Sequence, residues 1–159
     1  MERPDSSADG ESAAPAGKAD TVAGVLPAGW AVPAVGPFDR EWFTSGTLAV
    51  QECASCSTLQ HPPEEICHAC GSLELGTRPL TGRGTVHSFT VVHYAASPAL
   101  ADTVPYTVVL VSLDDAPQLR VVGNLLDGEA SIGLPVRAVW EERTADDGST
   151  VLLPQWLPA

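Results

Sequence analysis

Strand-forming residues dominate the second half of the chain. Runs rich in β-branched and aromatic residues recur between turn residues, at 84–94, 104–113, 118–126, 133–142 and 149–153. The second run, VPYTVVLVSL, is apolar at odd and even positions alike, which predicts a central strand. Asp146-Asp147-Gly148 is typical of a hairpin turn. Five strands with no convincing helix among them predict a small closed barrel, and the five-stranded Greek-key OB-fold is the natural candidate.

The run at 133–142 differs because its positions alternate. One face of this predicted strand carries Val136, Ala138 and Trp140. The opposite face carries Arg137, Val139 and Glu141. Alternation of this kind is typical of a strand with one face toward the core.

Residues 1–29 have a composition of their own. Ala, Gly, Ser and Pro supply 17 of the 29 residues, and no aromatic residue occurs among them. Such a segment cannot bury enough apolar area to offset the entropy lost on ordering, which predicts a disordered tail. The alternative is a segment that folds on a partner, and few apolar residues support it.

Residues 30–46 are predicted to form a linker and a short helix. Asp39 can cap this helix and Gly46 can end it. The helix would present one aromatic face, formed by Phe38, Trp42 and Phe43. Two interpretations of this face are equally open: it packs on the protein's own core, or it belongs to a surface for a partner protein.

Four cysteines lie within residues 47–79, as two Cys-x-x-Cys pairs separated by ten residues: Cys53, Cys56, Cys67 and Cys70. Two such pairs can form opposed knuckles whose sulfurs complete a tetrahedron around Zn²⁺. Four protein ligands leave no position for water, so the zinc is expected to be structural. A redox dithiol and an iron site are the alternatives. His61 and His68 are interpreted as bystanders.

The net charge of the chain restricts the classes of partner that we expect. The chain has 8 Lys and Arg against 20 Asp and Glu, a formal net charge of −12. Nucleic acids and anionic membrane surfaces require a basic patch, so neither is expected. No apolar run approaches the ~20 residues of a membrane span, and the N-terminus does not resemble a secretory signal. We therefore expect a cytoplasmic protein with reduced thiols.

Catalytic machinery is not expected in this chain. The cysteines are assigned to metal, and Ser88 lies between His87 and Phe89 in a strand, where neighbouring side chains point to opposite faces. His93 and Tyr94 are a possible acid–base pair, although a structural role is favoured. In the GRGTVH run, Arg83 and His87 could meet anionic groups of a ligand, with Arg78 just before them. The alternative is that these are ordinary surface residues.

The order of motifs resembles the DUF35 family. The aromatic helix leads into G-x-L-x-x-Q-x-C-x-x-C, then C-x-x-C-G-S, then GRGTVHSFTVVH from Gly82 to His93, and LPQWLP near the end. The resemblance covers residues 37–158 and implies a mainly β protein: a short N-terminal helix, a zinc ribbon at 47–79 and an OB-fold at 80–159. Many relatives have Gly and Arg where this chain has Ser57 and Glu64. The Glu weakens any contact between the ribbon and the phosphates of coenzyme A.

The resemblance also implies a role. Members are accessory subunits of acyl-CoA enzymes, so we expect a chain without activity alone that binds a thiolase-like, lipid-transfer-protein-type aldolase. This partner would cleave a β-hydroxyacyl-CoA in sterol or lipid side-chain degradation, in a two-plus-two heterotetramer with a CoA thioester as ligand. The alternative partners are a hotdog-fold, MaoC-like enoyl-CoA hydratase and a thiolase or acyltransferase complex. The interface candidates are Phe38, Trp42 and Phe43, and the CoA-contact candidates are Arg78, Arg83 and His87.

Overall fold

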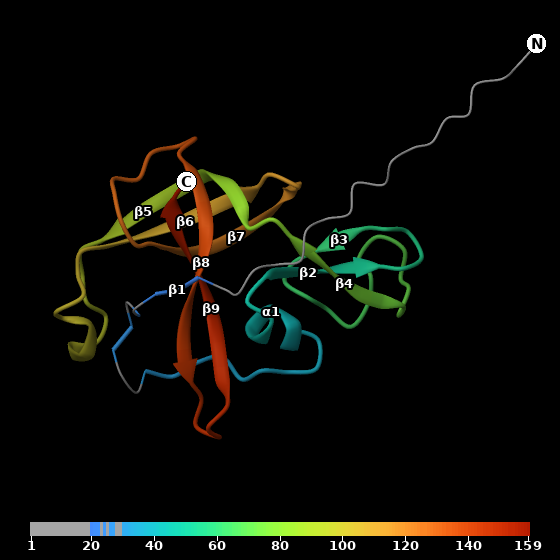
Figure 1. The fold of residues 1–159 in the computed structure, drawn as a ribbon, viewed down its shortest axis with the longest axis horizontal. Coiled ribbons are helices and arrows are strands. Elements are labelled where there is room, and N and C mark those ends of the chain that lie inside the picture. The colour runs from blue at the N-terminus through green and yellow to red at the C-terminus, as the bar shows by residue number, and fades with distance from the viewer. Residues whose placement is uncertain (1–19, 23, 25, 28–29) are drawn as a thin grey trace, which may run out of the picture.

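The computed structural model describes residues 20–22, 24, 26–27 and 30–159. A β-barrel and a three-stranded ribbon lie side by side, with one short helix next to both (Figure 1). The elements are β1 (Thr21–Val22), α1 (Arg40–Thr44), β2 (Leu48–Cys53), β3 (Leu59–Gln60), β4 (Leu75–Leu80), β5 (Arg83–Val92), η1 (Pro98–Leu100), β6 (Tyr106–Leu113), β7 (Ala116–Leu125), β8 (Pro135–Thr144) and β9 (Thr150–Pro158). The predicted mainly β fold is confirmed. No helix in the described part of the chain has the length and apolar character needed to cross a membrane.

Five strands close the barrel. The sheet runs β8-β5-β6-β7-β9, and β9 pairs back onto β8. The β8–β9 hairpin turns at Ala145–Ser149, and Gly148 has a left-handed φ of +83°, as the Asp-Asp-Gly sequence predicts. β9 continues through the PQWLP sequence, which places Trp156 in the barrel core. β6 lies between β5 and β7, as its two apolar faces predict.

One hydrophobic core joins the ribbon, the helix and the barrel. From the ribbon side it includes Leu48, Val50 and Leu80, and from the barrel Val109 and Trp156. α1 packs against β2 and β9 and adds a further side chain to this core. The position of the ribbon relative to the barrel is therefore fixed by buried apolar contacts.

The three aromatic residues predicted for the helix divide between core and surface, and Phe38 lies before α1 begins at Arg40. The Trp42 side chain is only 5% exposed and belongs to the core, which agrees with the first of the two interpretations of this face. Phe43 is half-buried against the same core, whereas Phe38 is 47% exposed. The helix ends before Gly46, which has a φ of +68°. Asp39 stands at the N-cap, but its carboxylate accepts a hydrogen bond from Gly36 N instead of capping the helix.

A short N-terminal strand departs from the predicted tail. β1 pairs in parallel with β8 at Trp140 and Glu141, and Arg137 donates to the Asp20 carboxylate at 2.9 Å. β5 pairs with β8 only as far as Arg137, so the rest of this edge of β8 is available to β1. The expected disorder therefore does not hold for residues 20–22. Residues 1–19 lie outside the described part of the chain.

Candidate metal centre and neighbouring surfaces

The two Cys-x-x-Cys pairs form matching knuckles. In the first, Ser57 N donates to Cys53 O at 2.8 Å, and in the second, Gly71 N donates to Cys67 O at 2.9 Å. Both donor residues have a positive φ, +57° at Ser57 and +74° at Gly71. Glycine adopts this conformation without steric cost, so the chain accepts backbone strain at the position where it has Ser57. The knuckles face each other because β2 pairs with both β3 and β4.

The four sulfur atoms fit one tetrahedral zinc ion. They all lie within 4.8 Å of one another. Cys53 and Cys70 Sγ are 3.6 Å apart, and Cys56 and Cys67 Sγ are 3.7 Å apart. A tetrahedron with Zn–S bonds of ~2.3 Å requires sulfur separations of about 3.8 Å. The thiolate set suits zinc and leaves no position for water, so the zinc of this ribbon is structural.

Hydrogen bonding favours the metal-binding form of one ligand. The Thr58 hydroxyl oxygen lies 3.1 Å from Cys56 Sγ. Hydrogen bonds from the Thr58 side chain and backbone lower the pKa of the Cys56 thiol from 9.0 to about 6. The thiolate is therefore accessible near neutral pH, which favours metal binding.

Two buried glutamines hold the loop that leads to the second knuckle. Gln51 donates to Glu64 O, and its side-chain oxygen accepts from Glu64 N at 2.9 Å. Gln60 donates to the Gln51 side chain and to Ile66 O, and accepts from His68 N. Sequence reasoning did not assign these roles. The only signal was Gln51 in the motif that leads into the first cysteine pair.

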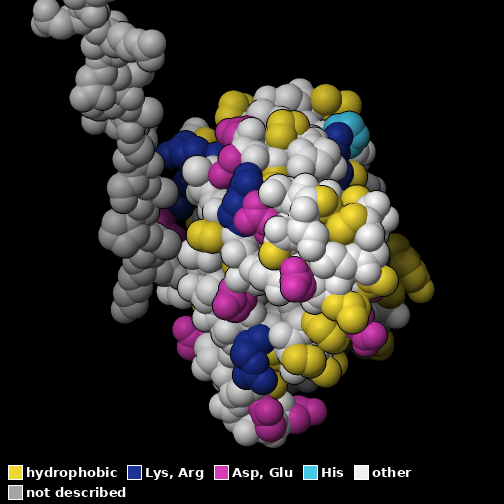
Figure 2. All heavy atoms as spheres, turned by 90° about the vertical axis from the view of Figure 1, so that its right-hand side faces the viewer, with side chains coloured by type: hydrophobic (Ala, Val, Ile, Leu, Met, Phe, Trp, Pro, Cys, Tyr) yellow, Lys and Arg dark blue, Asp and Glu magenta, His cyan; other side chains and the backbone are white. Residues whose placement is uncertain are grey.

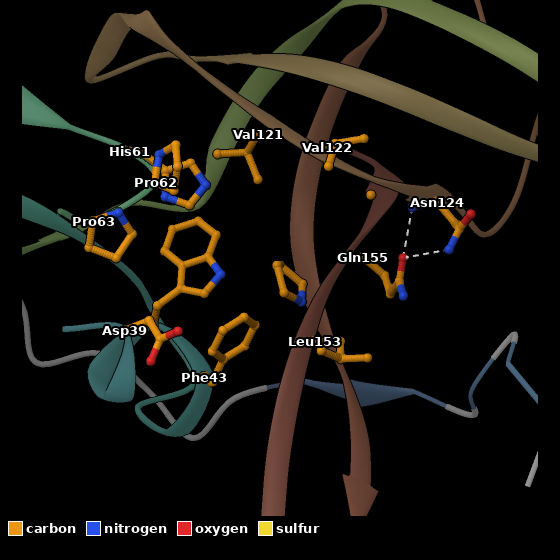
Figure 3. A pocket seen from close by; sticks show the side chains of 13 residues that line it. Asp39, Phe43, His61, Pro62, Pro63, Val121, Val122, Asn124, Leu153 and Gln155 are labelled. Atoms are coloured by element: carbon orange, nitrogen blue, oxygen red, sulfur yellow. Dashed lines mark hydrogen bonds between the residues drawn. The ribbon is translucent and has the colours of Figure 1, made fainter. Parts of the chain in front are cut away.

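A hollow of about 450 Å³ lies where the helix, the ribbon loop and the barrel meet. Figure 3 shows His61 and Phe43 on one side of it and Asn124 and Gln155 on the other. His61 stacks on Trp42, and burial lowers the pKa of His61 from 6.5 to about 4. The ring is therefore neutral at pH 7, and its buried Nδ1 has no hydrogen-bond partner among the described residues.

Comparisons with known proteins identify the family. Residues 44–76 match the ChsH2 rubredoxin-like zinc ribbon domain, and residues 77–141 match the ChsH2 C-terminal OB-fold domain. A DUF35 domain-containing scaffold protein of Methanocaldococcus jannaschii is 31% identical over 100 residues, which cover 60% of this chain and 68% of that protein. This chain belongs to the DUF35 family.

Two further relatives of this DUF35 protein carry functional descriptions. A chain in the solved structure of an Ltp2-ChsH2(DUF35) aldolase is 35% identical, with a TM-score of 0.64, and the match covers 80% of this chain and 98% of that one. A probable enoyl-CoA hydratase alpha subunit of Thermomonospora curvata is 38% identical over 132 residues, which cover 80% of this chain. The DUF35 chain spans only 39% of that hydratase subunit.

The predicted CoA-contact residues of the DUF35 chain are spread over two elements. Arg78 lies on β4 and pairs with Glu52, with 3.4 Å between Nη1 and Oε1. Arg83 opens β5 opposite Arg137 of β8, and His87 is exposed further along β5. No hydrogen bond or ion pair between described residues links the three candidates.

Exposed apolar side chains lie on and beside the ribbon of the DUF35 chain, among them Phe38, Ile66 and Leu73. Phe38 lines a groove of about 330 Å³ together with Leu73 and Leu75. Figure 2 views this end of the molecule, where hydrophobic side chains lie among scattered acidic and basic ones. Of the three predicted interface residues, Phe38 is the one whose exposure suits a partner surface.

Proposed function

We propose that this chain is a non-catalytic subunit of an acyl-CoA-processing complex, in which it binds and stabilises the catalytic enzyme. The observation that carries the proposal is the match to the DUF35 chain of an aldolase over 98% of that chain's length. The ribbon ligands Cys53, Cys56, Cys67 and Cys70 hold one structural zinc, which leaves this chain's thiols unavailable as nucleophiles. The ribbon at 47–79 and the OB-fold at 80–159 act as one body because they share a core.

The preferred partner is a thiolase-like aldolase that cleaves a β-hydroxyacyl-CoA by a retro-aldol reaction. Sterol or related lipid side chains are the proposed substrate class, and two copies of each subunit the proposed assembly. The partner supplies the acid–base residues for carbon–carbon bond cleavage. In the chain described here, Tyr94 is 82% exposed and Ser88 is also exposed on β5, so neither occupies an enclosed site.

An enoyl-CoA hydratase is the second candidate partner. The observation that favours it is sequence identity. The hydratase alpha subunit is 38% identical, the highest value among the relatives described above. The share of each relative's length that this chain matches favours the aldolase. The aldolase's DUF35 chain is matched almost completely, whereas the hydratase subunit is matched over about two-fifths of its length.

Contact with coenzyme A is proposed to be shared with the partner. Arg83 and His87 are exposed and can meet anionic groups of the ligand. Arg78 is the weaker candidate because its guanidinium already pairs with Glu52. With a net charge of −12, this chain offers few cationic groups, so the partner must supply most phosphate contacts.

Recovery of the tagged chain from its own cell tests the proposal. We expect a thiolase-fold protein in equimolar amount and retro-aldol activity on a β-hydroxyacyl-CoA that requires both chains. An Arg83→Ala variant should raise KM for the CoA substrate while the complex stays assembled. Recovery of a hydratase in place of the thiolase-fold protein would support the second candidate and overturn the first.

A further inference from the structure

The outer half of β5 has an edge that no other strand of the described chain covers. β6 pairs with β5 along its length, but β8 pairs with it only at residues 83–85. Val86 then exchanges backbone hydrogen bonds with residues 133–134. Beyond Val86, no backbone hydrogen bond between described residues reaches the outer edge of residues 87–92. In Figure 1 this end of β5 extends from the barrel toward the segment that carries η1.

The same half-strand exposes apolar side chains on the face that lines the barrel elsewhere. Phe89 pairs with Val109, so both side chains lie on one face of the sheet, and Val109 is fully buried. Phe89 and Val91 are nevertheless 41% exposed each. β8 no longer pairs with β5 at these residues, so the barrel wall does not cover their side chains. A strand added to the edge of β5 would continue the wall and cover both side chains.

The features that protect edge strands are missing from this stretch. Natural proteins protect exposed edges with lysine, proline, charged side chains or bulges. The sequence from Ser88 to Val92 is SFTVV, with no charge and no proline. The bulge between Val86 and Ser88 lies at the start of the free edge, and from Ser88 to Val92 the strand pairs in regular register with β6. An edge of this composition is suited to pairing with another strand.

The charges of the residues around this edge indicate which kind of strand would pair with it. None of the 20 acidic residues lies between Glu74 and Asp102, whereas Arg83, His87 and His93 lie on or beside β5. β6, the neighbouring strand, has no charged residue. A second copy would bring together two chains that each carry −12, so charge favours a strand from a different protein.

We propose that residues 87–92 receive an extended strand of the catalytic partner, which adds to the sheet by β-augmentation. The added strand carries apolar side chains that cover Phe89 and Val91. This proposal rests on the proposed function and names the surface by which the partner is held.

Hydrogen–deuterium exchange on the free chain and on the purified complex tests the pairing without any substitution. Backbone amides of 87–92 should exchange at least tenfold more slowly in the complex. Amides that exchange equally fast in both states would overturn the strand pairing while leaving the proposed function intact. Failure to recover any acyl-CoA partner would overturn both proposals. Protection that rises with the concentration of the free chain would show that a second copy covers the edge, which also overturns this proposal.

A matched pair of variants separates the edge from general surface effects. Val91→Lys places a charged side chain at the free edge, and Val122→Lys makes the same change at an exposed position of β7. Val91→Lys should weaken assembly at least tenfold, whereas Val122→Lys should change it less than twofold. Zinc content and melting temperature establish that each variant is folded. Equal effects of the two variants on assembly would overturn the proposal.

Discussion

The imidazole of His61 stacks on the indole of Trp42, with ring centroids 4.1 Å apart and planes tilted by 32°. This contact joins the ribbon loop to α1, and Trp42 continues it into the barrel core. The stack places a titratable ring where charge is poorly solvated. Acidification should therefore weaken the junction between ribbon and barrel.

His61 makes the stability depend on pH between about 4 and 6.5. Burial lowers its pKa to about 4 in the folded state, whereas the unfolded chain has the ordinary value near 6.5. The unfolded state therefore binds more protons in this window, and the free energy of unfolding falls as the pH falls. Between pH 7 and pH 5 we expect a loss of about 2 kcal/mol from this residue, measured by urea denaturation.

His61→Phe is the control for that measurement. It retains an aromatic ring on Trp42 but does not titrate, while the pH dependence of the zinc thiolates stays the same in both proteins. The stability difference between the wild type and this variant should change by about 2 kcal/mol over the same pH range. Parallel curves for the two proteins would show that His61 is not responsible.

Trp42 and Phe38 should behave oppositely when truncated. Trp42→Ala removes a buried core side chain and is expected to cost about 3–5 kcal/mol of unfolding free energy. Phe38→Ala changes a half-exposed side chain and should leave stability within about 0.5 kcal/mol while weakening partner binding. Chemical denaturation together with affinity for the copurified partner distinguishes the two effects. Unchanged affinity of Phe38→Ala would remove Phe38 from the interface.

The sequence predicted the features of this protein that depend on local spacing. The two Cys-x-x-Cys pairs, the apolar run of β6 and the Asp-Asp-Gly turn each contain their own signal within a few residues. The four sulfurs therefore lie together as their spacing predicts, and the barrel strands lie close to the predicted runs except that β9 continues to Pro158. Trp42 was left between core and interface because amphipathic spacing identifies a face but not what covers it.

The strand at 135–144 shows what local patterns omit. Alternation would expose Val139 and Glu141, yet both are fully buried. Gly24 lies directly against the Glu141 side chain, so the N-terminal segment covers that face of β8. This docking depends on a free strand edge and on buried hydrogen bonds, neither of which leaves a periodic signal in the sequence. The glutamines that hold the ribbon loop were missed for the same reason.

Loss of one zinc ligand should unfold the ribbon. Structural zinc contributes ~10–16 kcal/mol in isolated zinc-finger peptides, far more than the small ribbon can recover from its own contacts. Cys67→Ser should reduce bound zinc from one ion per chain to none and abolish partner binding, as measured by metal analysis and copurification. His68→Ala alters the adjacent exposed side chain and should retain zinc. A zinc-free Cys67→Ser protein that still assembles would contradict the structural role.

Ser57 offers a test of backbone strain in the first knuckle. Ser57→Gly relieves a left-handed conformation and should stabilise the protein by about 0.5–1 kcal/mol. Gly71→Ala introduces the same strain in the second knuckle, where an added Cβ would meet no atom within 4 Å, and should cost about 1 kcal/mol. Thermal denaturation at saturating zinc measures both. A destabilised Ser57→Gly protein would mean that the hydroxyl contributes more than the backbone costs.

The buried Glu141 depends on Arg143. Arg143 donates to Glu141 Oε1 at 3.4 Å and to the carbonyl oxygens of Leu26 and Pro27, and Gln155 donates to the second carboxylate oxygen at 2.9 Å. The Glu141 side chain has no exposed surface. Arg143→Met would leave this carboxylate buried without a cationic partner, and we expect a loss of about 3–5 kcal/mol.

A matched control and a double variant decide whether the unpaired charge of Glu141 causes the loss of stability in Arg143→Met. Arg137→Met breaks the exposed ion pair with Asp20 and should cost no more than about 1 kcal/mol. Adding Glu141→Gln to Arg143→Met removes the charge but keeps an amide beside Gln155, so part of the lost stability should return. If the double variant is no more stable than Arg143→Met alone, the lost hydrogen bonds to Leu26 and Pro27 account for the effect, and the N-terminal segment is held by Arg143 itself.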